Sequence, residues 1–353
     1  MPEVVFLKIN KVTKDEVRNV VHKAMEKAKW RNFIKGKKIF VKINGISDQL
    51  VPGQCTSPWV IDAVLEKLRK RFPNNEIYMG DADLAAAKQL NDAARIWGFK
   101  NLAKKYNVKF VNLSEQPLID TEFGGKVLKR TQVPKILLDV DCILNIPVAK
   151  SHCLTTITCC LKNHWGLLPR FRHQFHLKAD QAIPDVNNFF RKTTFNVVDM
   201  TVCMEGNAPR TGIPKICNVI MAGSDRVALD FTAASYMGFN AKSIKHIRNA
   251  EKMGLGSRER IKIIGDEFYI NKFKAPEANK QPIFFWEMSL RKVPIVKPLL
   301  FDTPIFRCLC EVSKFYNASF WYNLEGKKFL KEMMKTDYAA EYMPLLKKAR
   351  IKI

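Results

Sequence analysis

The chain alternates between strand-like and helix-like segments, and this alternation is the strongest constraint on its fold. Residues 37–45 read KKIFVKING, an apolar run broken by Asn-Gly, as expected of a strand. Residues 57–72 read SPWVIDAVLEKLRKRF, with apolar residues at helical spacing after a Ser-Pro start that is typical of a helix. The next strand signal is NEIYMGDAD, over residues 75–83. Such alternation predicts a mostly parallel sheet flanked by helices.

The alternation of strand and helix signals continues beyond residue 126, and the residue composition changes near residue 271. Further strand signals are KILLDVDCILNIPVAKSH, TFNVVDMTVCMEG and KICNVIMAG, whereas the last part mixes aromatic residues with lysines and prolines. We therefore expect an α/β protein with two lobes of mostly parallel sheet flanked by helices. The expected divisions are an N-terminal lobe at 1–125, a second lobe at 126–270 and a basic, aromatic, helical extension at 271–353.

The net charge limits the classes of partner. The chain has 353 residues, with 59 Lys and Arg against 34 Asp and Glu, which gives a net charge of +25. A surface of this charge attracts phosphates, nucleic acids, acidic proteins or anionic lipid headgroups. The aromatic segment 282–338 is a candidate for peripheral membrane contact. The alternative is that it caps the α/β body, since aromatic residues are ordinary core fillers.

The N-terminal residues, the apolar stretches and the cysteines together predict the cellular compartment. The N-terminal residues include no apolar run that ends in small residues, so we expect no secretory signal, and no uncharged apolar stretch is long enough for a membrane span. The nine cysteines are an odd number and lie mostly in apolar runs. A reduced, cytoplasmic protein, soluble or peripheral to a membrane, is the simplest interpretation.

Polar residues follow the first two strand signals, where a parallel sheet places its ligands. Lys42 and Asn44 alternate along one strand end and therefore point to the same side, and Asp81 ends the next strand. Ligands of such sheets bind beyond the carboxyl ends of the strands. A lysine and an amide placed there are suited to holding a carboxylate.

Residues 150–176, KSHCLTTITCCLKNHWGLLPRFRHQFH, contain four of the six histidines and raise three interpretations. His173 and His176, spaced i, i+3, are candidate metal ligands, but the segment has none of the paired signatures of a zinc site. The run LLPRFRHQFH has the composition of a nucleic-acid surface, although no recognition motif supports it. The third interpretation is an anion site.

The anion site is the interpretation that we favour. Hydroxyl, amide and ammonium donors are concentrated here: Lys150, His152, Thr155, Thr156, Thr158, Lys162 and Asn163. If residues 154–168 form a helix, Thr155, Thr158 and Lys162 lie on one face of it. The alternative is a buried structural segment rich in β-branched residues, with a solvated lysine. We favour the anion site because a purely structural segment would more easily use apolar residues at positions 150 and 162.

These motifs resemble those of domain-of-unknown-function family 362. The matching pieces are VKING…CTSPWVIDAVLEKL, IYMGDAD, KSHCLTTITCCLKNHWGLLP, NVVDMTVCMEGNAPRTGIP and VIMAGSDRVALDFTAASYMGF, from about residue 37 to 268. The resemblance implies a two-part α/β body and a site built from the motif residues. These are Lys42, Asn44, Thr56, Asp81, Lys150, His152, Thr158, Lys162, Asn163, His173, Asp199, Glu205, Asp225 and Asp230.

The resemblance implies no assigned reaction. Many relatives carry a ferredoxin-type iron–sulfur module, but this chain lacks the closely spaced cysteine run, so no cluster is carried over. The cofactor is unknown, and a metal ion stays a candidate. From the residues themselves, Asp225 is expected to cap a helix and Asp230 to lie one turn into it.

The function that these patterns favour is an enzyme acting on an anionic carboxylate or phosphate compound in a cleft between the lobes. His152, His173, Lys162 and Glu205 are the candidate acid–base groups, since histidine titrates near neutral pH and neighbouring cations favour its neutral form. Oxidoreductase and isomerase or lyase chemistry both stay open. The alternative is a non-catalytic protein whose basic surface binds anionic membranes or RNA.

Overall fold

The structure is a computed structural model that describes residues 1–84, 89–277, 289, 308, 311–312 and 315–353, with the backbone alone at 317 and 318. The first part of the aromatic segment 282–338, up to residue 307, lies outside these residues except for residue 289. No helix of the described residues is long and apolar enough to cross a membrane.

One ten-stranded sheet runs through the molecule in the order β12-β1-β11-β10-β7-β2-β3-β4, and β8 and β9 continue from β10. β5 and β6 form a separate antiparallel pair. The strands are β1 (Glu3–Lys8), β2 (Lys38–Ile43), β3 (Glu76–Asp81), β4 (Lys109–Asn112), β5 (Leu118–Glu122), β6 (Arg130–Pro134), β7 (Cys142–Ile146), β8 (Val148–His152), β9 (Thr156–Thr158), β10 (Thr193–Glu205), β11 (Ile213–Gly223) and β12 (Lys262–Gly265).

The predicted α/β class is confirmed, and its strands are mostly parallel. β2 pairs in parallel with β3 and β7, β3 with β4, and β7 with β10. β11 is antiparallel to both β10 and β1. Strands from both expected lobes therefore share a single sheet, because β7 and β10 lie between β2 and β11. The sequence did not predict this shared sheet, because strand patterns do not reveal which strands pair. The proposed boundary between two lobes at residue 125 stays a prediction.

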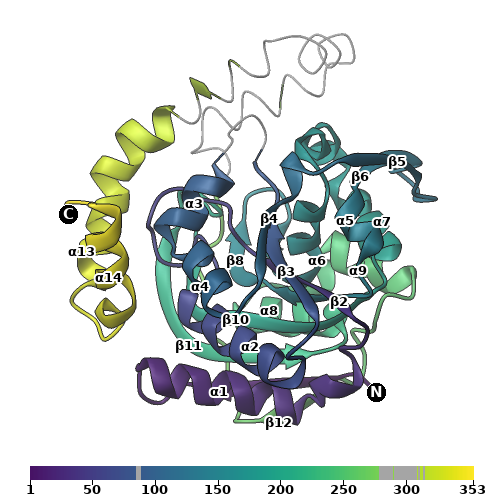
Figure 1. Ribbon diagram of the computed structural model, residues 1–353, viewed down its shortest axis with the longest axis horizontal. Coiled ribbons are helices and arrows are strands. Elements are labelled where there is room, and N and C mark those ends of the chain that lie inside the picture. Colours follow the sequence, from purple (N-terminus) through teal and green to yellow (C-terminus); the bar gives the residue numbers. More distant parts are fainter. Residues whose placement is uncertain (85–88, 278–288, 290–307, 309–310, 313–314) are drawn as a thin grey trace.

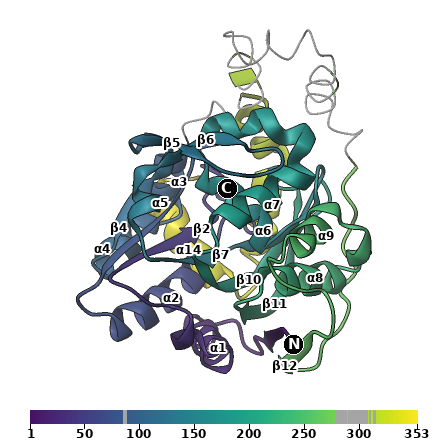
Figure 2. The same ribbon diagram turned by 90° about the vertical axis from the view of Figure 1, so that its right-hand side faces the viewer.

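Helices cover both faces of this sheet (Figures 1 and 2). Side chains of α1, α2, α3, α4, α13 and α14 join one buried cluster, and those of α5, α6, α7, α8 and α9 join another. Alternate strand residues supply the two clusters, as Phe40 and Val41 do. The helices are α1 (Lys14–Lys27), α2 (Pro58–Arg71), α3 (Leu90–Ile96), α4 (Phe99–Lys105), α5 (Lys135–Asp139), α6 (Cys160–Asn163), α7 (Ala179–Phe189), α8 (Arg226–Tyr236), α9 (Lys245–Lys252), α13 (Lys327–Met333) and α14 (Ala339–Ala349).

Two local expectations are corrected by the structure. The helix over 154–168 does not form, because Thr156–Thr158 pairs with β8 as strand β9, and only the short helix α6 follows. Thr155, Thr158 and Lys162 are therefore not aligned on one helix face. The strand signal at 135–152 is divided into helix α5 and strands β7 and β8. β-branched residues at 155–158 favour the extended backbone.

The described C-terminal helices pack onto the body. Leu330 of α13 and Tyr342 and Leu346 of α14 lie in the same buried cluster as α2 and α3. Glu341 is 3% exposed and accepts hydrogen bonds from the Ser57 hydroxyl and from the backbone N–H of Trp59, at 3.0 Å for the latter. α14 thereby caps the first turn of α2, whose predicted Ser57 N-cap is confirmed.

Glu341 gives stability a defined pH dependence. Burial raises the pKa of its carboxyl to about 8 from the ordinary 4.5. Because the native state then binds the proton more tightly than the unfolded state, this group lowers the free energy of unfolding as pH rises from 4.5 to 8. The slope approaches about 1.4 kcal/mol per pH unit. We expect Glu341→Gln, which keeps an acceptor without titrating, to flatten that slope in urea unfolding.

The control for this measurement is Glu332→Gln, which changes an exposed carboxylate on α13. It should follow the wild-type curve. An unchanged slope in Glu341→Gln would show that Glu341 is ionised in the native state.

Candidate functional site

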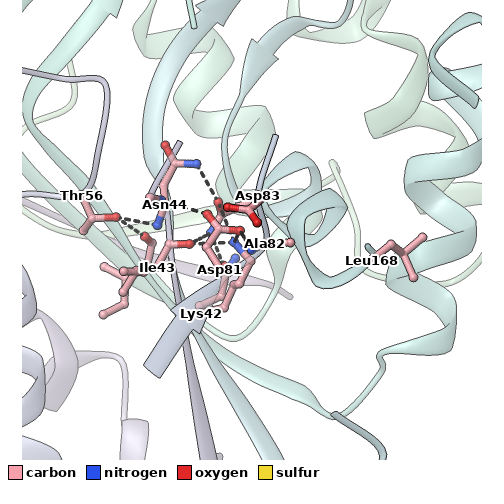
Figure 3. A network of polar contacts seen from close by, with 12 residues as sticks. Lys42, Ile43, Asn44, Thr56, Asp81, Ala82, Asp83 and Leu168 are labelled. Atoms are coloured by element: carbon pink, nitrogen blue, oxygen red, sulfur yellow. Dashed lines mark hydrogen bonds and ion pairs between the residues drawn. The ribbon is translucent and has the colours of Figure 1, made fainter. Parts of the chain in front are cut away.

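A buried ion pair joins the carboxyl ends of β2 and β3. Lys42 Nζ lies 2.8 Å from Asp81 Oδ1, and both side chains are almost fully enclosed, at 0% and 3% exposed. The ammonium also donates to the Ile43 carbonyl at 2.7 Å. Figure 3 shows Lys42, Asn44 and Asp81 gathered at this point. Burial lowers the pKa of Lys42 and the Asp81 carboxylate opposes that shift.

The ion pair is closed over by a glycine. Asp81 accepts two backbone N–H bonds, from Gly45 and Ala82, at 2.8 and 2.7 Å. A Cβ placed on Gly166 would lie 2.2 Å from Asp81 Oδ1 and 3.0 Å from Lys42 Nζ. Gly166 belongs to the short 3₁₀ helix η3 (His164–Leu167). Only a residue without a side chain allows this backbone to approach so closely.

Buried amides extend the network across the sheet. The Asn163 Oδ1 accepts from Asn44 Nδ2 at 3.1 Å, and Asn163 Nδ2 donates to Asn145 Oδ1 at 2.7 Å. Asn145 Nδ2 in turn donates to Asn196 Oδ1 at 3.0 Å. These contacts link β7 and β10 to the residue that follows β2, so the amides hold three strands and α6 in one register.

Lys150 reaches this network from β8. Its ammonium donates to Asn44 Oδ1 and to the Gln54 carbonyl, both at 2.6 Å. Burial lowers its pKa to about 8. Thr56, in the turn before α2, accepts from the Asn44 backbone N–H and donates to the Ile146 carbonyl, both at 2.9 Å. Lys150 and Thr56 therefore meet at Asn44, although they are far apart in the sequence. The ligand-binding role of each of these residues stays a prediction.

Lys162 lies among cations. Burial, Arg172 and Lys150 lower the pKa of its ammonium to about 7, and only the Cys153 thiol opposes them. No carboxylate among the described residues stabilises this charge. The side chain is partly exposed. Lys162 thus differs from Lys42, which has a carboxylate partner, and from Lys150, which donates to an amide and a carbonyl.

His152 lies near Lys162 and is held neutral. Burial lowers the pKa of its imidazole well below the ordinary value, and the charge of Lys162 adds to this effect. Its Nδ1 accepts a hydrogen bond from the Leu154 backbone N–H at 3.0 Å, which leaves the proton of the neutral ring on Nε2. Thr158 lies opposite Lys150 across β8 and β9, and its buried hydroxyl has no partner among the described residues.

The other two predicted acid–base residues, Glu205 and His173, are each 7% exposed. Glu205 is paired with Lys215 at 3.1 Å and accepts from the Lys274 backbone N–H at 3.1 Å. The ring of His173 packs edge-on against His176, with centroids 4.6 Å apart, and His176 stacks on Trp165. The acid–base role of Glu205 and of His173 stays a prediction.

The described residues contain one buried group with metal-ligand atoms close together, and it does not include the candidate pair His173 and His176. Cys159, Cys160 and Asp230 have ligand atoms within 4.8 Å of one another. However, Asp230 accepts from the backbone N–H of Cys160 and Leu161, at 2.7 and 3.1 Å, and burial raises the pKa of both thiols. Cys159 and Cys160 are therefore buried thiols of the core.

The remaining acidic residues are held by backbone N–H groups. Asp225 caps α8 by accepting from Val227 and Ala228, as predicted. Asp199 accepts from the Ser57 N–H at 2.7 Å. Arg172, within the run LLPRFRHQFH, is 2% exposed and donates to the Asp83 carbonyl at 2.9 Å.

Several network residues were not predicted. Asn145 and Asn196 lie inside strands that read as ordinary apolar runs, and Gln54 contributes only a backbone carbonyl. His246, on α9, was not predicted either; it is buried and lies outside the hydrogen-bond network. An asparagine inside an apolar strand run was the one available signal, because a buried amide needs partners.

The model of a domain of unknown function, family 362, matches residues 39–235, more than half of the chain. The chain belongs to this family. A thylakoid-associated protein of Synechocystis sp. is 24% identical over 239 residues, which are 64% of this chain and 70% of that protein. The lactate racemase apoprotein of Thermoanaerobacterium thermosaccharolyticum is 13% identical over 71% of this chain, with a TM-score of 0.42, and the chain covers 57% of its length. Membership of family 362 names no reaction.

The Lys42–Asp81 pair generates a stability prediction. Asp81→Ala leaves a buried ammonium without its counter-charge, so it should lower the free energy of unfolding by about 3–5 kcal/mol. Lys42→Met combined with Asp81→Ala removes both charges and should recover part of that loss. Urea unfolding of the single and double variants measures the coupling. Additive losses would contradict a coupled pair.

Proposed function

We propose that this member of family 362 is an enzyme that binds an anionic small molecule, a carboxylate or a phosphate, beside Lys162. The observation that carries the proposal is the ammonium of Lys162, a partly exposed residue, which lies among Arg172, Lys150 and His152 with no carboxylate acting on it among the described residues. A cation in cationic surroundings is costly for a fold and is stabilised when an anion binds. The neutral His152 supplies an N–H for the same anion.

The arrangement also divides the roles of the two groups. His152 Nδ1 is occupied by the Leu154 N–H, so the ring offers Nε2–H as a donor. Lys162, with a pKa of about 7, is the group suited to exchange a proton with the bound molecule near neutral pH. This assignment shifts the proton-transfer role from His152 to Lys162. Oxidation–reduction and isomerisation or elimination are both compatible with such a pair.

Anion binding should depend on the charge of Lys162. Lys162→Met should weaken binding of sulfate and oxalate about tenfold or more, because it removes a charge-assisted contact. Neither anion titrates between about pH 6 and 9, so wild-type affinity should fall above pH 7, where Lys162 loses its proton. Lys162→Met should flatten this pH profile. Isothermal titration at constant ionic strength measures both effects.

Lys100→Met is the matched control, because it removes the same charge from an exposed position on α4. It should leave affinity and pH profile unchanged. Equal losses of affinity in both variants would show that only the net charge of the protein matters, and would overturn the proposal. Wild-type protein that binds neither sulfate nor oxalate would also overturn it.

We propose a second property, contact with an anionic membrane, on one specific observation. Large apolar side chains between residues 312 and 324 are 45% to 69% exposed: Val312, Phe315, Tyr316, Phe320 and Leu324. Lys327, Lys328 and Lys331 follow on α13. Apolar groups beside lysines suit the interface of an anionic bilayer. The Synechocystis relative is described as thylakoid-associated, which agrees with this property.

Vesicle sedimentation tests the membrane contact. Wild-type protein should sediment with vesicles of phosphatidylcholine and phosphatidylglycerol, and less so at high salt. Leu324→Glu should reduce sedimentation, whereas Leu177→Glu, at another exposed apolar position, should not. Equal behaviour of the two variants would contradict a contact through residues 312–324.

A further inference from the structure

His246 is a fully buried histidine without a structural partner. Its side chain is 0% exposed, and neither Nδ1 nor Nε2 has a hydrogen-bond partner among the described residues. Buried imidazoles usually bond at least one ring nitrogen, as the buried His164 does with Asn187 and as even the partly exposed His22 does with the Ala63 carbonyl. Leaving both nitrogens unpartnered costs stability, so an apolar residue would serve the packing better.

The surroundings of His246 connect it to the anion site. α9 packs against α7 and α8, and its Ile247 lies in the same buried cluster as Leu161 of α6. Figure 2 shows α6, α7 and α9 side by side. The Lys162 charge lowers the pKa of both His246 and His152. Three groups from β8, α6 and α9 therefore lie within electrostatic reach of one another.

We propose that His246 is a ligand-contacting residue of the anion site, where its neutral imidazole donates an N–H to the anion held by Lys162. This rests on the proposed function and extends it to a third element of the fold. The ligand is then a compact anion with at least two acceptor oxygens, one for the ammonium and another for the imidazoles. Carboxylates and phosphoryl groups both meet this requirement.

Burial and the neighbouring Lys162 lower the pKa of His246 to about 3. The ring is therefore neutral at every pH at which the protein would be assayed, and its contribution to binding does not titrate. Lys162, by contrast, loses its proton near pH 7. The two contacts are distinguishable by their pH dependence, even though both act on one anion.

The test is His246→Leu, which replaces the unpartnered imidazole by an apolar side chain. Thermal unfolding without ligand should occur at the same temperature or higher, because two buried polar atoms without partners are removed. Affinity for sulfate and oxalate should fall about tenfold, the loss expected of one hydrogen bond to an anion. The ratio of wild-type to variant affinity should stay constant with pH, unlike that of Lys162→Met.

His246→Gln, which keeps an N–H donor, should recover part of the affinity, and His22→Leu, on the other face of the sheet, should leave affinity unchanged. Wild-type affinity in His246→Leu, with Lys162→Met impaired, would overturn this proposal and leave the proposed function standing. A His246→Leu chain that unfolds early or fails to fold would show a packing role and would also overturn it. Wild-type protein that binds neither sulfate nor oxalate would remove both proposals.

Discussion

The ion pair between Lys42 and Asp81 is the constraint on which the rest of the site depends. Two charges with almost no exposure are stable only when each satisfies the other and the surrounding dipoles complete the hydrogen bonding. The backbone N–H groups of Gly45 and Ala82 and the carbonyl of Ile43 do this. They thereby fix the chain that follows β2, including Asn44, through which Lys150 and Asn163 join the network.

The sequence predicted the elements that local patterns determine. Lys42, Asn44 and Asp81 were located because parallel strands present their carboxyl ends at one edge, and Ser57 was located as a cap. The contact between Lys150 and Asn44 spans 106 positions, and no local pattern encodes the pairing of β8 with β10 that creates it. The helix expected over 154–168 failed for a different reason, since β9 forms a local hairpin with β8 and its β-branched residues favour the extended backbone.

The site residues differ in how completely their charges are satisfied. Lys42 and Lys150 have carboxylate, amide or carbonyl partners, so their role in the free protein is structural. Lys162 and His246 lack such partners among the described residues, so they carry an electrostatic and hydrogen-bonding cost in the free protein. This difference is the reason why we propose anion binding at Lys162 rather than at the ion pair. Sequence reasoning missed His246, because a histidine in a helix is ordinarily a surface or packing residue.

The bond between Glu341 and Ser57 joins residues 284 positions apart, at the turn that presents Gln54 and Thr56 to the network. Closing a loop of this length is entropically expensive, so contacts of this kind form after the local strands and helices. During synthesis, the first turn of α2 emerges long before the Glu341 carboxyl that caps it. The turn that carries Gln54 and Thr56 therefore gains its last fixed contact only after the C-terminal helix has left the ribosome.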